Sequence, residues 1–258
     1  TKPSGYSVLM IVTCSPEIEI VSPGRPMTRL IKDFLGSRGY LNIMMEPRSG
    51  LPSFWSTTLA KVLVGDQPCL LQPWLNGRFK FEEKQKGDMA SWKADHSAML
   101  QERVTSYKNA GFKCDVERFF RVTGTYAVLS GKADLVIRDA ESDRPKIRPT
   151  IIDVKSGKPR DSDTAQVLIE MVMIPLAWKV PGMQFDGEVH YANDPMVKLK
   201  STQAETIKPK LFALLKQLGT MERPTPSPSR DACRYCAVPD AECGQRFQDS
   251  DSVSTDLF

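Results

Sequence analysis

The pattern of apolar positions changes its period near the middle of the chain. Between residues 89 and 109 the apolar residues fall on one helical face, and Gly111 ends the predicted helix. From Val116 to Leu129 the sequence is rich in β-branched and aromatic residues without helical spacing, which is typical of strands. Two further strands are predicted at 132–138 and 149–154, on either side of a charged connector.

Helices and short strands alternate over the rest of the chain. The pattern predicts helices at 27–35, 52–63, 163–178 and 204–218 and short strands at 188–191 and 196–199. This order predicts an α/β fold in which helices flank a mixed central sheet.

The proline-rich stretch at 224–228 cannot form a helix or an interior strand, and it separates a cysteine-rich end from the rest. We therefore expect four parts: an N-terminal extension with a helical segment at 1–50, a core at 51–222, a cysteine-rich segment at 223–247 and an acidic, disordered tail at 248–258.

Composition narrows the class of protein only a little. The chain has 258 residues, of which 41% are hydrophobic and 26% charged, as in ordinary globular domains. No apolar run reaches the roughly 20 residues of a membrane-spanning helix, so we expect a soluble cytoplasmic protein. The net charge of +4 is compatible with a polyanionic partner but does not identify one. A phosphate-binding loop is not expected, because the two Ser-Gly-Lys sequences lack its first glycine.

A pair of acids and a lysine suggest metal-dependent chemistry. Asp153 and Lys155 are two residues apart on a predicted strand, so their side chains share a face. Antiparallel pairing with the preceding strand would bring Asp134 close to Asp153. Two carboxylates can bind Mg²⁺ or Mn²⁺, and a lysine beside them can orient water and offset developing charge on a phosphate. Asp-x-Lys alone is also typical of an exposed ion pair, so the prediction depends on the surrounding residues.

The surrounding residues are His96, Glu117 and Gln166. Each also has an ordinary structural interpretation, since histidines occur on apolar helix faces and glutamates on solvated strands. Taken in order, these residues with Asp134, Asp153 and Lys155 resemble the RecB-type branch of the PD-(D/E)XK nucleases, over about residues 52–243. Within that branch the chain is similar to the CRISPR-associated spacer-acquisition nucleases and the AddB-type nuclease domains.

The resemblance implies a restriction-endonuclease-like core and assigns roles to its residues. His96, Asp134 and Asp153 would bind the metal ion, Lys155 would be catalytic, Gln166 would support the site and Glu117 would assist. The family usually has a tyrosine four residues after the glutamine, where this chain has Glu170. We therefore expect substrate positioning to differ from the family pattern.

Six cysteines are present, and three of them have the spacing of metal ligands: Cys233, Cys236 and Cys243. A disulfide framework is not expected in a chain of this length without a secretory signal. The fourth thiolate could come from Cys14, Cys69 or Cys114, and spacing alone fits zinc and an iron–sulfur cluster equally well.

The resemblance narrows the choice of the fourth ligand. RecB-type relatives that carry a four-iron cluster have one cysteine before the nuclease core and an aromatic-rich helix after it. Cys69 fits this slot, although Leu70 replaces the usual proline. This implies a [4Fe–4S] cluster on Cys69, Cys233, Cys236 and Cys243 in a C-terminal cap, with zinc as the alternative, and leaves Cys14 and Cys114 as ordinary buried thiols.

The resemblance also implies a function: a Mg²⁺- or Mn²⁺-dependent deoxyribonuclease, acting as an exonuclease on single strands or DNA ends, in repair, recombination or CRISPR adaptation. The alternatives are a non-catalytic DNA-binding module of the same fold and a zinc-stapled RNA-processing nuclease. DNA would be the partner, in the nucleoid, with Lys132, Lys158 and Arg160 on its backbone. The tail, ending in Leu257-Phe258, resembles short peptides that dock on replication clamps, which implies a replication or adaptation protein as a second partner.

Overall fold

The computed structural model describes residues 46–80, 90–139, 148–234 and 236–247. All of them belong to one compact unit, Ile43–Phe258. The predicted helix at 27–35, the charged connector, Tyr235 and the tail lie outside the described residues. Within the described residues, every helix is too short or too polar to cross a membrane.

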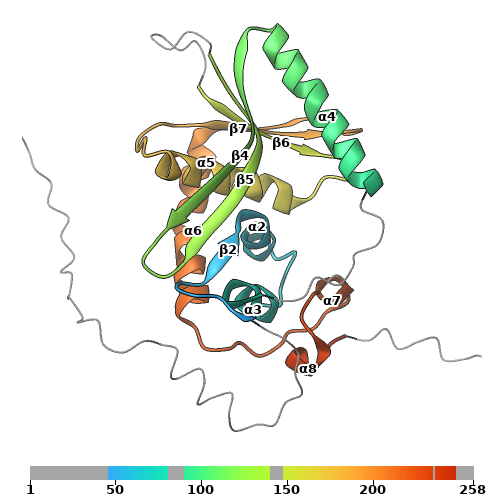
Figure 1. Cartoon of the computed structure of the whole chain (residues 1–258), viewed down its shortest axis with the longest axis vertical. Helices are drawn as coiled ribbons and strands as arrows, with labels where there is room; N and C mark the ends of the chain where they lie inside the picture. Colours follow the sequence, from blue (N-terminus) through green and yellow to red (C-terminus); the bar gives the residue numbers. More distant parts are fainter. Residues whose placement is uncertain (1–45, 81–89, 140–147, 235, 248–258) are drawn as a thin grey trace, which may run out of the picture. The chain divides into compact units, whose positions relative to one another are not determined.

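A mixed six-stranded sheet forms the centre of the unit (Figure 1). β5 (Val128–Asp139) is its middle strand, and β4 (Phe112–Thr123) pairs antiparallel along one full edge of it. The other edge of β5 is shared, because β2 (Ser53–Trp55) pairs parallel with Val128–Ser130 and β6 (Thr150–Lys155) pairs antiparallel with Leu135–Ile137. The sheet continues through β7 (Asp186–Tyr191), parallel to β6, to β8 (Val197–Leu199).

Helices cover both faces of the sheet (Figure 1). The main core lies between the sheet and α2 (Ser56–Val64), α5 (Asp161–Ala177) and α6 (Ser201–Thr220). A smaller cluster lies on the opposite face, where Leu100 and Val104 of α4 (Ala90–Asn109) pack on Leu135 and Ile152. The predicted α/β class, with a mixed central sheet between helices, is thereby confirmed.

The element boundaries follow local chemistry. Gly65 and Gly111 have positive φ values of 85° and 87° and follow the ends of α2 and α4, which is the conformation that glycine adopts most readily. α5 begins at Asp161, two residues before the predicted start, and the Asp163 carboxylate in its first turn accepts the backbone N–H of Arg160 at 3.0 Å.

Several boundaries differ from the sequence prediction, and two of the differences have a clear structural cause. Ser53–Trp55 is a strand and not the first turn of a helix, since its backbone pairs with β5. β5 begins at Val128, four residues earlier than predicted, because a turn in which Gly124 N–H donates to the Ala127 carbonyl at 2.9 Å closes a long β4–β5 hairpin. β4 begins at Phe112, so Glu117 lies in the middle of this strand and not at its start.

The alternation of side chains between the sheet faces shifts at Asp134. Residues two apart in a regular strand share a face, yet Ala133 packs in the main core and Leu135 in the α4 cluster. The opposed pair Glu117 and Asp134 is missing from the β4–β5 ladder, and Glu117 has a positive φ of 48°. Asp134 thus lies at an irregular level of an otherwise regular hairpin, on the stretch of β5 that neither β2 nor β6 covers.

The C-terminal segment packs on the helix that follows Cys69. α3 (Leu71–Arg78) contributes Leu71 and Leu75 to a third cluster with Ala232 and Val238, which belong to α7 (Arg230–Arg234) and the chain before α8 (Asp240–Cys243). The short strands β1 (Glu46–Pro47) and β3 (Phe79–Lys80) pair beside α3.

Polar contacts join α3 to the end of α6. Trp74 Nε1 donates to the Met221 carbonyl at 3.1 Å, and Arg78 donates to the Leu218 carbonyl at 2.9 Å. The Trp74 side chain is therefore held in place by packing and by this hydrogen bond.

Candidate functional site

Asp134 lies where β5 and β6 separate. The backbone ladder between these strands includes the pair Leu135 and Ile152 and does not continue to the next level. There the Asp134 carboxylate takes the place of a backbone acceptor, because its Oδ2 accepts the Val154 N–H at 2.9 Å. Its Oδ1 lies 3.7 Å from His96 Nε2 of α4. This arrangement fixes one nearly buried carboxylate at the point where the sheet divides.

Asp153 and Lys155 project from β6 into the same site, as the strand periodicity predicts. Asp153 is only 1% exposed, and Lys155 Nζ lies 2.7 Å from its Oδ2. The intervening Val154 is buried and packs on the α4 side of the sheet. The pair is therefore a buried ion pair and not the exposed one that the short sequence pattern also allowed.

Gln166 of α5 completes a closed set of contacts with this pair. Its Nε2 donates to Asp153 Oδ1 at 3.0 Å, and its Oε1 accepts from Lys155 Nζ at 3.2 Å. The amide therefore holds the carboxylate and the ammonium in a fixed relation to each other. Each of the three side chains contacts the other two, which leaves little rotational freedom in the site.

Glu170 is a fourth member that the sequence did not assign to the site. It is fully buried one turn beyond Gln166, and its Oε1 accepts a second hydrogen bond from Gln166 Nε2 at 3.1 Å. Within the described structure, its Oε2 is buried without a hydrogen-bond partner. The available signal was the spacing, since Gln166 and Glu170 are polar residues four apart in a helix whose neighbouring positions are apolar and buried.

The electrostatics of the site reflect crowded acids away from water. Burial raises the pKa of Asp153 to about 7, with Lys155 opposing the shift and Asp134 adding to it. Burial followed by the Asp153 carboxylate raises the pKa of Glu170 well above its usual range. For Lys155, burial alone would lower the pKa, but the carboxylates of Asp153 and Asp134 outweigh it and raise the pKa. The lysine therefore stays an ammonium while the acids compete for protons.

The stability of the metal-free protein should fall as the pH rises from 5 to 8. Asp153 and Glu170 hold their protons in the folded state at pH values where the unfolded chain has lost them, so the unfolded state binds fewer protons and stability decreases with pH. We expect a loss of about 3 kcal/mol across this window. Denaturant unfolding at four pH values checks it. Glu170→Gln should flatten the dependence, and a stability that rises with pH would contradict the prediction.

The other predicted residues are distributed around this centre. The hydrogen bond to the Asp134 carboxylate raises the pKa of His96, against burial, so Asp134 favours the charged imidazole. Glu117 is exposed and forms an ion pair with Lys132. Lys158 and Arg160 are exposed on the loop between β6 and α5. The structure thus brings His96, Asp134, Asp153, Lys155 and Gln166 together and directs Glu117 and Lys132 toward each other at the surface.

The oxygen donors of the site suit a hard divalent cation. Asp134, Asp153 and Glu170 offer carboxylate oxygens in a buried setting, and one of these oxygens, Glu170 Oε2, has no hydrogen-bond donor among the described residues. Carboxylates are the ligands that Mg²⁺ and Mn²⁺ prefer. In the described part of the chain no three His, Cys, Asp or Glu side chains already converge on one point as they do around a metal ion.

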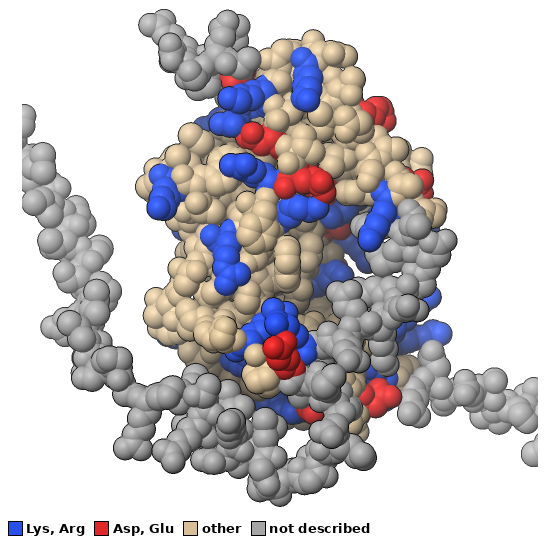
Figure 2. Space-filling model, in the orientation of Figure 1, with Lys and Arg blue, Asp and Glu red and all other residues tan. Residues whose placement is uncertain are grey.

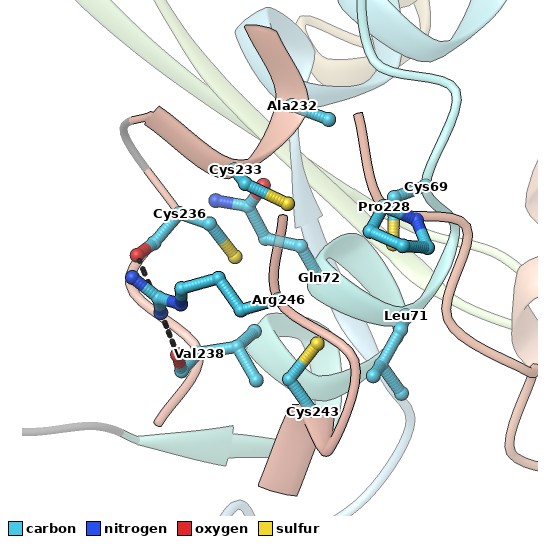
Figure 3. Close-up of a pocket in the computed structure, with 10 residues that line it drawn as sticks. All are labelled: Cys69, Leu71, Gln72, Pro228, Ala232, Cys233, Cys236, Val238, Cys243 and Arg246. Atoms are coloured by element: carbon cyan, nitrogen blue, oxygen red, sulfur yellow. Dashed lines mark hydrogen bonds between the residues drawn. The ribbon is translucent and has the colours of Figure 1, made fainter. Parts of the chain in front are cut away.

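Four cysteines line a single cavity between α3 and the C-terminal segment. They are Cys69, Cys233, Cys236 and Cys243, and Figure 3 shows their sulfur atoms arranged around the space between them. Leu71, Ala232 and Val238 supply apolar walls. These are the four cysteines that the sequence combined, whereas Cys114 lies elsewhere, against the α4 cluster. Cys14 lies outside the described residues.

Polar groups support the cysteine cavity from one side. The backbone N–H of Phe247 donates to Cys233 Sγ at 3.4 Å. The Arg246 side chain lines the cavity, donates to the carbonyls of Cys236 and Val238, and lies 2.6 Å from Asp240 (Figure 3). Without a metal, burial raises the pKa of Cys236, and the Arg246 side chain opposes this shift. Soft thiolates in an apolar setting suit zinc or an iron–sulfur cluster.

A groove of about 970 Å³ adjoins the cysteine cavity. Gln72 and Ala232 line this groove as well as the cysteine cavity. At its other end it is lined by Arg160 and by Tyr191, which pairs with Lys155 in the β6–β7 register. The charged lining of the groove is mixed, with Lys61, Arg160 and Arg234 beside Asp66 and Asp161.

Comparison with protein families finds no family that matches the chain, and curated proteins give no match in sequence. Among solved structures, the one described as "Crystal structure of SSO0001" is similar with a TM-score of 0.36 and 11% identity, over 81% of this chain and 90% of that chain. A similarity of this size does not identify the fold family or the function.

Proposed function

We propose that the chain is a Mg²⁺- or Mn²⁺-dependent deoxyribonuclease with a restriction-endonuclease-like core and an iron–sulfur cap. The observation that carries the proposal is the set of the buried Asp134, Asp153 and Gln166 with the partly buried Lys155 at the division of the sheet. A structural ion pair has no need of a second buried carboxylate and a bridging amide. Burying charged groups is costly. Several of them gathered in one place therefore favour a functional site.

The residues would divide the work of phosphodiester hydrolysis. Asp134 and Asp153, with His96 in its neutral form, would hold the divalent cation, which supplies Lewis acidity toward the phosphate and a lowered pKa of bound water. Lys155, kept as an ammonium by the carboxylates, would orient the attacking water and offset charge on the phosphate oxygens. Gln166 would hold the Lys155 and Asp153 side chains in a fixed relative position through its two hydrogen bonds.

For the cysteine site we propose a [4Fe–4S] cluster, with zinc as the alternative. The four thiols around one cavity and the hydrogen bond to Cys233 Sγ support a metal–thiolate centre. Cys69 comes directly before α3, and the other three belong to the last described segment, so the centre would tie the two ends of the core together. Its role would be structural.

The groove supports a nucleic-acid substrate. Tyr191, the strand neighbour of Lys155, lines the groove, and Lys61, Arg160 and Arg234 give it three basic side chains against the two acids Asp66 and Asp161. Basic side chains of this kind contact the phosphate backbone without reading sequence. An exonuclease on single strands or DNA ends fits this arrangement, in repair, recombination or CRISPR adaptation, with a replication or adaptation protein as a further partner of the tail.

The test is cleavage of end-labelled single-stranded DNA with Mn²⁺ or Mg²⁺, in parallel with an RNA of the same sequence and a control in EDTA. We expect metal-dependent cleavage of DNA that EDTA abolishes, and a product ladder that reports end preference. Preferential cleavage of RNA would favour the RNA-processing alternative. Binding of DNA without cleavage under any metal would favour a non-catalytic module.

A further inference from the structure

Two large aromatic side chains are exposed on the strands that pair with β5 and belong to none of the hydrophobic clusters. Trp55 is 50% exposed and Phe119 is 51% exposed. Their rings meet edge to face, with centroids 6.2 Å apart and an interplanar angle of 66°. Both side chains belong to strands, β2 and β4, so their backbones are held rigidly on either side of β5.

The aromatic pair lies close to Asp134 along the same strand. Trp55 pairs with Ser130 and Phe119 with Lys132, and Asp134 follows two residues later. Two residues span about 7 Å of strand. Phe120 is buried in the main core, so its neighbour Phe119 points to the opposite face of the sheet. That is the face which α4, the helix that carries His96, covers further along.

Cationic side chains flank the pair. Lys132 and Arg121 are exposed, and Arg121 pairs in register with Ser130, the residue that also pairs with Trp55. On the side of the molecule seen in Figure 2, lysine and arginine side chains are scattered over uncharged surface, with fewer aspartates and glutamates among them. Aromatic rings interleaved with cations are the combination with which proteins hold unpaired nucleic acid, because bases stack on the rings while phosphates meet the charges.

A protein partner fits this surface less well. A stable protein interface buries about 800 Å² on each partner around an apolar centre that is depleted in charge. Here two aromatic side chains are bordered directly by Lys132, Glu117 and Arg121. A small stacking surface among charges suits a strand of nucleotides.

We propose that Trp55 and Phe119 form a stacking surface for the unpaired bases of a DNA strand that enters the carboxylate site. The inference rests on the proposed nuclease function and specifies its substrate as DNA with at least a short unpaired stretch. Stacking at this point would hold the strand by its bases while Asp134 and its neighbours meet the backbone. It also explains why a tryptophan and a phenylalanine remain half exposed at adjacent positions.

The experiment measures the affinity of the full chain for a fluorescein-labelled oligothymidylate, in EDTA so that the strand stays intact. Trp55→Ala and Phe119→Ala should each weaken binding about 5- to 150-fold, the range expected for one lost base–aromatic stack. Trp55→Phe should stay within about threefold of the parent, since phenylalanine also stacks. Phe212→Ala is the matched control, because Phe212 is 41% exposed on α6 and contributes to neither site.

A second readout reports stacking directly. An oligonucleotide that contains 2-aminopurine loses fluorescence when that base stacks on an aromatic ring, so the parent should quench it and Trp55→Ala should quench it less. If the parent binds and cleaves DNA while the alanine variants bind like Phe212→Ala, the stacking proposal is wrong and the nuclease proposal stands. If the parent neither binds nor cleaves single-stranded DNA, both fall.

Discussion

Replacing Lys155 by methionine should lower the rate of metal-dependent cleavage at least about 100-fold and leave the affinity for DNA within a few fold of the parent. The loss follows from the position of the ammonium, 2.7 Å from Asp153 and within a hydrogen bond of Gln166. Removing one preorganised group that stabilises transition-state charge typically costs this much in rate. Methionine keeps the apolar stem, and Asp153 can take up a proton in place of the lost partner, since burial already raises its pKa to about 7.

The measurement compares initial rates on end-labelled single-stranded DNA with Mn²⁺, and affinities in EDTA. Lys210→Met is the matched control, because Lys210 is exposed on α6 and contacts no part of the proposed site. It should cleave at the parent's rate. Equal activity of Lys155→Met and Lys210→Met would remove the lysine from the mechanism and would place the hydrolytic centre elsewhere on the chain.

Strand periodicity made the centre of the site predictable from sequence. Asp153 and Lys155 share a face because they are two apart on a strand, and Asp134 approaches them because the preceding strand pairs antiparallel. Short-range rules of this kind also located α4, α5 and the β-rich middle. The sheet and its flanking helices follow from the order of these elements.

The irregular features were not predictable in the same way. The shift of alternation at Asp134 depends on the positive φ of Glu117, which no local pattern predicts for a glutamate in a strand. The short strand β2 exists only because its backbone pairs with residues more than 70 positions away. The uncovered stretch of β5 on which Asp134 lies is likewise set by tertiary contacts, because it is the gap between the pairing with β2 and the pairing with β6.

Glu170 shows a different limit of sequence reasoning. A helix as apolar as α5 suggests a core element, and a glutamate within it reads as a departure from a family pattern. The spacing of four residues indicates its contact with Gln166, but its place beside Asp153 becomes visible only when α5 is placed against β6, since Gln166 Nε2 donates to both carboxylates. The cysteines show the same dependence, because the spacing left three candidates for the fourth thiol and the fold brings one of them, Cys69, to the cavity.

Replacing Cys69 by alanine should remove the metal–thiolate centre and destabilise the whole core. The centre would join Cys69 to Cys233, which are 233 − 69 = 164 positions apart. A cross-link over so long a loop is worth about 5 kcal/mol by the chain-entropy argument. The rest of the C-terminal attachment is a small apolar cluster of Leu71, Leu75, Ala232 and Val238, so little else would hold this segment in place.

Iron, sulfide and zinc content, the absorbance near 400 nm and the thermal unfolding midpoint of protein purified without oxygen test this expectation. Cys114→Ala is the control, since Cys114 packs against the α4 cluster and not in the cavity, and it should keep the parent's metal content. A brown parent with four irons would support the cluster, and a colourless parent with one zinc would establish the alternative. A parent without bound metal, or a Cys69→Ala variant with unchanged metal content and stability, would show that the four thiols do not act together.

The outcome matters for the nuclease as well, because the groove shares Gln72 and Ala232 with the cysteine cavity. Loss of the centre should therefore weaken DNA binding even though Asp134, Asp153 and Lys155 remain intact.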